Sequence, residues 1–417
     1  MSKWIVGVVG MLLLGTDAAR GADWPAFRGP TGDGVAGDSK APITWAIDQH
    51  VAWKTPMPGP GNGSPIVLNR QVMVTSAEDP QGKQRSLLSF DALTGEQQWK
   101  QTVMVERHMP THKTNPYSGS TPVSDGEIVV VWHATGGLHA YTMEGQPVWH
   151  RDLGTFEHIW GYASSPIIHD GKVILHSGPG KMRIFVAAFD VQTGKQLWLT
   201  EEAFTGDGDY NANKQYQGSW ATPVVANDLI VVTQPTRIVA YHPDDGSIAW
   251  FCKGVSHARG DLAYSSPTIA DNVCVVTGGF HGPMLAVPME GHGDITDKRL
   301  WRFEKQPQSI GSAVHVDGFL YRPNAGPGGI QCIEVATGVE RWMDRSVRGD
   351  YWASIIRVGY LLYATNQDAT TVVFKANPER FEQVAVNHLK ERCNATPSVA
   401  DGLLYFRTYK YLICVKP

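Results

Sequence analysis

The chain has 417 residues, of which 42 % are hydrophobic, and a formal net charge of −4 from 36 basic and 40 acidic side chains. Neither sign forms a run, which argues against a nucleic-acid partner held through its phosphates. The 44 glycines, 26 prolines and 14 tryptophans are typical of many short strands joined by turns.

Residues 1–21 have the pattern of a secretory signal peptide. Lys3 precedes an apolar run over residues 4–15, and small side chains follow it. The run is too short for a stable membrane span, so we expect cleavage, no transmembrane span afterwards, and a periplasmic or extracellular protein. An uncleaved N-terminal anchor is the alternative. No cysteine occurs before Cys252, which excludes lipid attachment to a processed N-terminal cysteine.

Residues 22–63 form a segment rich in proline and glycine. Its one strand-like stretch is Val51 to Thr55, which carries Trp53. No second strand follows at once, so this strand needs a partner from elsewhere in the chain.

The stretch from Leu88 to Lys100 predicts a β-hairpin. Asp91 can accept hydrogen bonds from the turn amides, and Gly95 can take the positive φ of a tight turn. The pattern recurs from Asp190, and a glycine lies four residues before a tryptophan in five copies. These pairs are Gly95 and Trp99, Gly145 and Trp149, Gly194 and Trp198, Gly246 and Trp250, and Gly338 and Trp342.

A second repeat is a start signal, a small hydroxyl residue usually followed by proline and an apolar pair. Its second residues are 42 to 57 positions apart, which is the spacing of four-stranded propeller blades. The eight starts are Ser64-Pro65, Thr121-Pro122, Ser165-Pro166, Thr222-Pro223, Ser266-Pro267, Ser312-Ala313, Ser354-Ile355 and Thr396-Pro397.

The eighth unit ends at Pro417 without an outer strand, and the strand at Trp53 is the missing piece. We therefore predict an all-β protein: an eight-bladed β-propeller of four-stranded antiparallel blades over residues 64–417, closed by the N-terminal strand 51–55, which leaves no open sheet edge. The outer strands carry a tryptophan that we expect to fill the wedge between blades. These residues are Trp53, Trp99, Trp149, Trp198, Trp250, Trp301 and Trp342, with Phe381 or Val384 in the seventh unit.

The D-x-x-T-G-x-x-x-W hairpins, the S/T-P starts and the count of eight units resemble the pyrroloquinoline-quinone-like (PQQ-like) repeat proteins over about residues 50–417. That family includes quinoprotein alcohol dehydrogenases and the lipoprotein subunit of the outer-membrane β-barrel assembly machinery. The resemblance implies the propeller fold. The opening W-P-A-F-R-G-P also resembles a group of secreted bacterial propellers.

The dehydrogenases resemble one another in a vicinal cysteine pair, calcium ligands and an aspartate base. No two of the five cysteines here are adjacent, and no calcium ligand or base maps onto a particular residue. We therefore assign no catalytic residue and no metal ligand, and PQQ with calcium stays a possible cofactor. The lipoprotein subunit matches in length, but its anchor cysteine is missing.

The loops that lead into each start are expected to gather on one face around the propeller axis. Aromatic residues lie three to five positions before the second start residue, and histidines lie eight to ten before it. This indicates a funnel for a sugar, a quinone-like ring or a peptide; alternatively, the rings plug the channel or pack between blades. The candidates are Tyr117, Tyr162, Trp220, Tyr264, Trp352, His112, His158, His257, His388, Arg259, Asp261, Arg348 and Asp350, with Asp207 and Asp209 nearby.

The sequence favours a secreted or periplasmic binding module over an enzyme. Its expected partner is a small molecule, a carbohydrate or a protein, bound by a monomer. A PQQ-dependent alcohol or sugar dehydrogenase with a divergent site is the first alternative, and a scaffold subunit of an envelope complex is the second. Neither G-x-S-x-G nor H-E-x-x-H occurs, so no local motif indicates hydrolytic chemistry.

Overall fold

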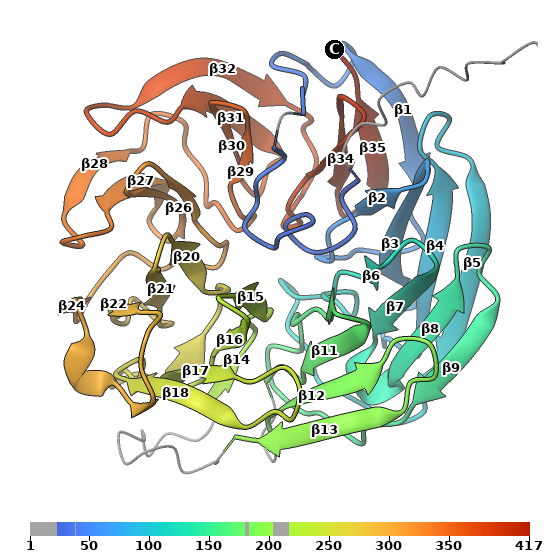
Figure 1. The fold of residues 1–417 in the computed structure, drawn as a ribbon. Helices are drawn as coiled ribbons and strands as arrows, with labels where there is room; N and C mark the ends of the chain where they lie inside the picture. Colours follow the sequence, from blue (N-terminus) through green and yellow to red (C-terminus); the bar gives the residue numbers. More distant parts are fainter. Residues whose placement is uncertain (1–22, 38, 180–182, 203–216) are drawn as a thin grey trace, which may run out of the picture.

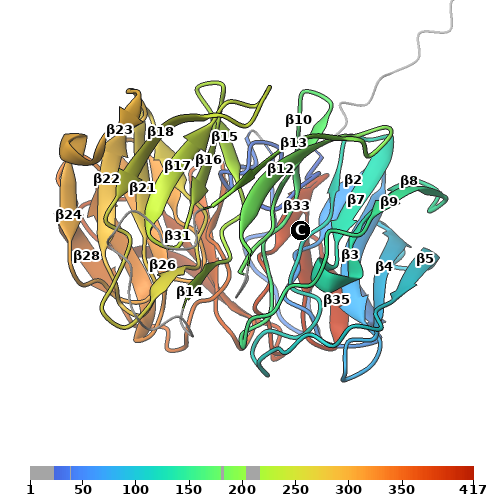
Figure 2. The same ribbon diagram turned by 90° about the horizontal axis from the view of Figure 1, so that it is seen from below.

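Eight antiparallel sheets surround a central axis in the computed structural model of the chain, as Figures 1 and 2 show. The structure describes residues 23–37, 39–179, 183–202 and 217–417. The expected signal peptide, Asp207 and Asp209 lie outside these residues. The predicted eight-bladed propeller is confirmed, and each blade begins directly after one of the eight start signals.

Blades 1 to 4 follow one another from the first start to residue 253. Each has a short innermost strand and three longer strands toward the outside, and blade 4 gains a fifth strand from a later insertion. Their strands are β2 (Ile66–Leu68), β3 (Gln71–Ala77), β4 (Gln84–Asp91) and β5 (Gln97–Met104); β6 (Val123–Ser124), β7 (Ile128–Trp132), β8 (Leu138–Thr142) and β9 (Pro147–Arg151); β10 (Ile167–His169), β11 (Lys172–His176), β12 (Phe185–Asp190) and β13 (Gln196–Glu201); and β15 (Val224–Ala226), β16 (Leu229–Thr233), β17 (Arg237–Tyr241), β18 (Ile248–Lys253) and β23 (Gly293–Asp294).

Blades 5 to 8 complete the ring with the same strand order. Their strands are β20 (Thr268–Ala270), β21 (Val273–Thr277), β22 (Met284–Pro288) and β24 (Trp301–Phe303); β25 (Val314–Val316), β26 (Phe319–Ala325), β27 (Gly328–Glu334) and β28 (Glu340–Asp344); β29 (Ile356–Val358), β30 (Leu361–Thr365), β31 (Thr370–Lys375) and β32 (Glu382–His388); and β33 (Ser398–Ala400), β34 (Leu403–Arg407), β35 (Tyr411–Val415) and β1 (Val51–Pro56).

The N-terminal strand closes the ring as predicted. β1 pairs antiparallel with β35, and Trp53 lies opposite Cys414. The first strand of the chain therefore becomes the outer strand of the last blade, next to β5 and β4 of blade 1 in Figure 1.

Successive blades meet through the repeated tryptophan and glycine. The indole ring of Trp149 in blade 2 lies against Gly194 in the hairpin of blade 3, so closely that a Cβ on that glycine would be 2.4 Å from the ring. The indole N–H of Trp149 donates to the carbonyl of Val191 at 2.8 Å. The same contact joins Trp53 to Gly95, Trp99 to Gly145, Trp198 to Gly246, and Trp301 to Gly338.

Blade 5 lacks this hairpin, and its substitute is an insertion between β22 and β24. The insertion contributes β23, which pairs with β18, and the short 3-10 helix η3 (Thr296–Lys298). Trp250 on β18 is fully buried, and its indole nitrogen has no hydrogen-bond partner among the described residues. The junction between blades 4 and 5 therefore depends on apolar burial where its neighbours also have a hydrogen bond.

In the seventh blade, the prediction for the outer aromatic residue is wrong. The register pairs Ala385 with Val373 beside the bulge where the other blades place their tryptophan, whereas Phe381 precedes β32 and Val384 is exposed. The space is filled from another part of the chain. Trp45 of the N-terminal segment stacks on Tyr363 of blade 7 and contacts Phe406 of blade 8.

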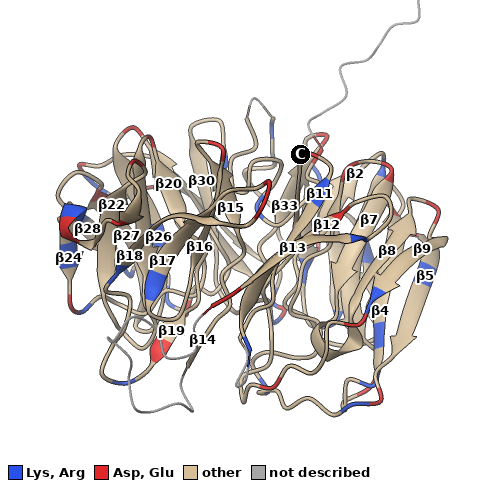
Figure 3. Cartoon of the chain, turned by 60° about the horizontal axis from the view of Figure 1, so that its bottom comes forward, with Lys and Arg blue, Asp and Glu red and all other residues tan. Residues whose placement is uncertain are grey.

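Basic and acidic residues are both spread over strands and turns in the view of Figure 3. All five cysteines are buried and unpaired, and Cys274, Cys332 and Cys414 lie within strands as predicted. No helix within the described residues has the length and apolar character needed to cross a membrane.

Candidate functional site

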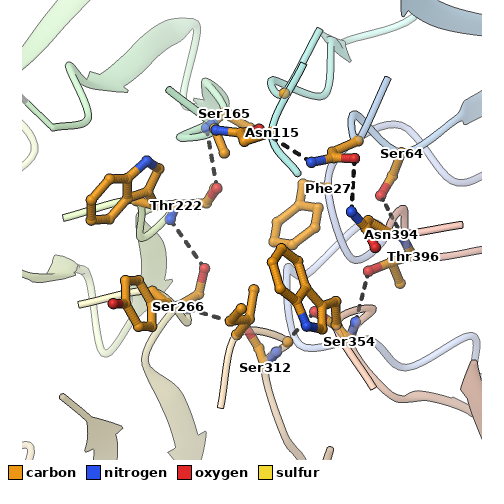
Figure 4. A pocket seen from close by; sticks show the side chains of 18 of the residues that line it. Phe27, Ser64, Asn115, Ser165, Thr222, Ser266, Ser312, Ser354, Asn394 and Thr396 are labelled. Atoms are coloured by element: carbon orange, nitrogen blue, oxygen red, sulfur yellow. Dashed lines mark hydrogen bonds between the residues drawn. The ribbon is translucent and has the colours of Figure 1, made fainter. Parts of the chain in front are cut away.

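The eight hydroxyl residues of the start signals form a closed ring of hydrogen bonds around the axis. The backbone N–H of each donates to the side-chain hydroxyl of its counterpart in the next blade, at 2.9 to 3.1 Å. The bond from the Thr396 amide to Ser64 Oγ closes the circle, as seen in Figure 4. Within the described part of the chain, none of the eight donates its own hydroxyl proton. We call these residues the hydroxyl ring: Ser64, Thr121, Ser165, Thr222, Ser266, Ser312, Ser354 and Thr396.

A pocket of about 380 Å³ lies on the axis inside this ring. All eight members of the hydroxyl ring line it, and so do the eight residues that lie two positions before them. Because each inner strand runs away from its start, this second set lies nearer the face of the connecting loops. We call it the rim ring: Asn62, Gly119, Ala163, Trp220, Tyr264, Ile310, Trp352 and Asn394.

The N-terminal segment forms the floor of the pocket. Trp24 exchanges backbone hydrogen bonds with Val67 of β2, and Val35 lies in a β-bridge with Arg357 of β29, so residues 24–35 cross from blade 1 to blade 7. Both contacts lie three residues beyond the hydroxyl ring, on the side away from the connecting loops. Figure 4 shows Phe27 of this segment in the middle of the ring, and the pocket is therefore blind at this end.

One wall of the pocket is aromatic. The strands β14 (Gln217–Ser219) and β19 (Asp261–Ala263) pair in parallel just before blades 4 and 5. They bring Trp220 and Tyr264 together, with ring centroids 5.5 Å apart. Trp160 lies 5.9 Å from Trp220, and Phe280 lies 5.3 Å from Trp160. We call Trp160, Trp220, Tyr264 and Phe280 the aromatic wall.

Local backbone structure fixes the aromatic wall. The indole N–H of Trp220 donates to the carbonyl of Gly161 at 3.0 Å. Phe280 has φ of 51°, a left-handed conformation that costs free energy in a residue other than glycine. The guanidinium of Arg259 lies 4.9 Å from its ring centroid on the outer side. Holding Phe280 at the pocket therefore costs the fold conformational free energy.

The opposite wall consists of amides. The Asn62 side chain donates to Thr114 O at 3.0 Å and to Asn115 Oδ1 at 3.2 Å. Asn394 donates to Asn62 Oδ1 at 3.2 Å, and Asn115 donates to the carbonyl of Trp160 at 2.7 Å. The N–H groups of these amides are used inside the protein, and each side-chain oxygen already accepts one hydrogen bond, that of Asn394 from Gln367 at 2.8 Å, which leaves one lone pair on each oxygen. We call Asn62, Asn115 and Asn394 the amide wall.

A third polar feature is the indole N–H of Trp352, which comes from blade 7. The nitrogen is buried, and no described residue accepts its hydrogen bond. A buried donor without an acceptor costs about 1–3 kcal/mol. Trp352 lines the pocket, but its nitrogen is buried, so an acceptor on a bound molecule would reach it and remove that cost only if the indole ring turned toward the pocket.

Among the described residues that line the pocket there is no lysine, arginine, aspartate or glutamate. Burial lowers the pKa of His158, which lies edge-on to Trp220, to about 4, and burial raises the pKa of Tyr264 above its usual value. Both groups are therefore uncharged at pH 7, and the site favours an uncharged ligand.

Four of the predicted site residues line the pocket: His112, Trp220, Tyr264 and Trp352. Tyr117 and Tyr162 lie instead against the buried guanidinium of Arg85, with ring centroids 5.0 and 5.5 Å from it. His158, His257, Arg259 and Asp261 lie behind the aromatic wall and outside the lining. Arg348 and Asp350 are exposed outside it. His388, predicted on a loop, is the last residue of strand β32.

The sequence contained a signal for the missed residues. The predicted aromatics at one fixed offset, two before the hydroxyl residue, line the pocket, whereas Tyr117 and Tyr162 lie at other offsets and are buried. Applying the offset to all eight blades would have added Asn62, Gly119, Ala163, Ile310 and Asn394. Phe27, Trp160, Phe280 and Asn115 follow no such rule.

The lining does not fit PQQ with calcium. PQQ carries three carboxylates, which require cationic partners, and calcium requires several oxygen ligands that include carboxylates. The described lining residues include no lysine, arginine or carboxylate. Across the described residues, no group of three or more histidine, cysteine, aspartate or glutamate side chains could hold a metal ion.

Comparison with known proteins gives one family and many structures of the same fold. A sequence profile of the family described as outer membrane protein assembly factor BamB matches residues 35–251 and 86–344. No curated protein is significantly similar in sequence.

Three solved structures illustrate the likeness. BamB from Moraxella catarrhalis is 12 % identical with a TM-score of 0.61, and the match covers 88 % of this chain and 97 % of that one. A europium-containing methanol dehydrogenase is 12 % identical with a TM-score of 0.66, over 93 % and 89 % of the two chains. The quinohemoprotein alcohol dehydrogenase from Comamonas testosteroni is 13 % identical with a TM-score of 0.66, over 96 % and 81 %. At these identities the likeness shows the fold alone.

Proposed function

The chain belongs to the PQQ-like repeat family described as outer membrane protein assembly factor BamB, and we propose that it is a binding protein that takes a small, uncharged ligand into its axial pocket. Periplasmic or extracellular location is part of the proposal. It is supported by the resemblance of residues 1–21 to a signal peptide and by the envelope role that the family description states.

The observation that carries the proposal is the composition of the pocket. Aromatic rings from several blades and amide oxygens line the axial cavity, and its described lining holds no lysine, arginine, aspartate or glutamate. Ligand sites are typically concave, mostly apolar and equipped with a few placed polar groups. Phe280, held at a positive φ, is consistent with a site that tolerates strain for function.

The experiment compares ligand binding by the full chain with and without a blocked pocket. Ala163 belongs to the rim ring, at a position where other blades carry tryptophan or tyrosine, so Ala163→Phe fills the pocket with a residue type that the ring already accepts. Binding is measured by intrinsic tryptophan fluorescence and calorimetry with neutral sugars, menadione, a Gly-Phe-Gly tripeptide, and PQQ with calcium chloride. We expect a saturable ligand whose affinity Ala163→Phe lowers at least tenfold.

The matched control is Ala258→Phe, which adds the same side chain to an exposed position of a connecting loop outside the lining. It should bind as the unmodified chain does. Equal binding by the two variants would refute the axial pocket as the site. Binding of PQQ with calcium together with dye-linked alcohol oxidation would instead support the dehydrogenase alternative, which the neutral lining disfavours.

A scaffold role in an envelope complex is the second candidate function. The observation in its favour is the family match, because the family description names an assembly factor. A pull-down from envelope extract with the full chain tests it. Stoichiometric capture of a membrane assembly complex that persists in Ala163→Phe would support a scaffold independent of the pocket.

A further inference from the structure

We propose that the ligand of the axial pocket is a neutral sugar, either a monosaccharide or the end of a short oligosaccharide. This inference rests on the proposed function, since it names the chemical class that the same pocket takes. Three features of the pocket carry it: the shape of the aromatic wall, the pairing of donors with acceptors, and the asymmetry of the rim ring.

The aromatic wall is curved, whereas a flat ligand needs a slot between parallel rings. Trp160 and Trp220 are inclined by 43°, Trp220 and Tyr264 by 51°, and Trp160 and Phe280 by 79°. Tilted faces suit the puckered ring of a sugar, whose C–H groups pack against aromatic faces. None of these three pairs of rings is parallel, so a flat quinone would stack on one of these described rings at a time.

The polar groups offer both donors and acceptors around the cavity. Each oxygen of the hydroxyl ring accepts one hydrogen bond from a backbone amide and retains its own proton to donate, and Trp352 adds an indole N–H. On the amide wall, the oxygen of Asn115 accepts from Asn62 and keeps a second lone pair. A sugar hydroxyl donates and accepts at once, so it can pair with both kinds of group.

The open part of the pocket lies beside the amide wall, because the small members of the rim ring are on that side. The large members, Trp220, Tyr264, Ile310 and Trp352, come from blades 4 to 7, and the small or amide members come from blades 8 and 1 to 3. A ligand therefore lies with one face toward the aromatic wall and its edge toward the amides. Phe27 lines the pocket on the segment that crosses beneath the hydroxyl ring, so we expect a chain to enter by its terminus.

The neutral lining also discriminates among sugars. A carboxylate in the pocket would lose its hydration without gaining a lysine or arginine partner from the described lining, which is costly. We therefore expect glucuronate to bind at least tenfold more weakly than the corresponding neutral hexose.

The test is calorimetry and fluorescence titration of the full chain with D-glucose, D-galactose, N-acetyl-D-glucosamine, maltose, cellobiose and D-glucuronate. Trp352→Phe keeps the ring and removes the N–H, and should lower affinity for the best neutral sugar about fivefold to tenfold. Trp220→Ala removes part of the aromatic wall and should lower it at least tenfold. Trp301→Phe, at a blade junction outside the pocket, is the control and should bind normally. Thermal unfolding checks that each variant is folded.

The outcomes separate the inference from the function on which it rests. A neutral sugar whose affinity falls in Trp352→Phe but not in Trp301→Phe supports the inference. If menadione or Gly-Phe-Gly binds and Ala163→Phe blocks it, while no neutral sugar binds, the sugar is refuted and the axial binding site stands. If no compound in either set binds, both proposals are refuted. A sugar that binds every folded variant equally lies elsewhere, which also refutes the inference.

Discussion

A glycine lies beneath a tryptophan at five of the blade junctions, and the contact leaves no room for a side chain. The Cβ of an alanine at position 194 would be 2.4 Å from Trp149, whereas at Gly171, in the first turn of the same blade, nothing lies within 4 Å. Both glycines have similar positive φ values, +65° and +70°. The pair therefore separates the cost of backbone conformation from the cost of overpacking.

Gly194→Ala is expected to destabilise the protein more than Gly171→Ala does. Each substitution costs about 1–2 kcal/mol for the left-handed backbone, and Gly194→Ala adds about 1–3 kcal/mol because the indole must move. Urea unfolding of the two variants measures the difference. Equal losses would show that Trp149 can shift without cost.

Buried histidines make stability depend on pH, because burial lowers the pKa of His133, His158 and His176. Burial lowers the pKa of His158 and of His176 to about 4 from the ordinary 6.5. The unfolded chain therefore takes up protons below about pH 6.5 while the native chain resists until about pH 4. Native stability is fully present above pH 6.5 and falls across that window, by up to about 3 kcal/mol for each group.

The measurement is the free energy of unfolding from pH 8 to pH 4. It should be flat from pH 8 to 7 and decline below 6.5, and His176→Asn should make the decline shallower. Several carboxylates with lowered pKa values, Asp91 and Asp190 among them, add their own loss only at lower pH. A constant free energy between pH 7 and 4.5 would contradict the assignment.

At the scale of elements, the strand β1 is the piece on which closure depends. It pairs along β35, and its Trp53 covers Gly95 of blade 1 and donates to the carbonyl of Ala92 at 3.0 Å. Without it, β35 becomes an open edge and the junction between blades 8 and 1 loses its indole.

Deletion of residues 51–56 is therefore expected to abolish soluble, monomeric folding. The control is Ala52→Ser, an exposed change on the same strand, which should leave the unfolding transition unchanged. Size-exclusion chromatography and thermal unfolding report the result. A monomeric deletion variant with cooperative unfolding would show that the ring holds without its closing strand.

The repeated elements could be predicted from the sequence because each carries its own local signal. The strand that carries Trp53 was recognisable as an outer strand with no blade of its own, and the number of blades followed from the eight start signals. The role of Trp45 could not be predicted, because it compensates for Ala385 in a blade more than 300 positions away. The N-terminal segment that carries Trp45 repeats no blade motif, so its sequence does not indicate which blades it contacts.

For the whole molecule, a nearly symmetric frame encloses an asymmetric pocket. Four residues that the sequence singled out line this pocket, since loops before inner strands must converge on the axis. The sequence did not supply Phe27, which reaches the pocket from the irregular N-terminal segment, or Phe280, whose position depends on a strained loop within blade 5. The repeated blade sequence produces the propeller, and residues that differ from the repeat produce the asymmetric pocket.

The ring of hydrogen bonds has a consequence for how such a chain arises. Every blade supplies the same two halves of a link, an amide that donates to the next blade and a hydroxyl that accepts from the preceding one. A duplicated repeat brings both halves with it, so each intermediate in a history of duplications satisfies every link. The side chains two residues earlier lie outside this ring of bonds, apart from the bond between Asn394 and Asn62, so mutation at most of these positions can diversify the pocket while the hydroxyl ring stays unchanged.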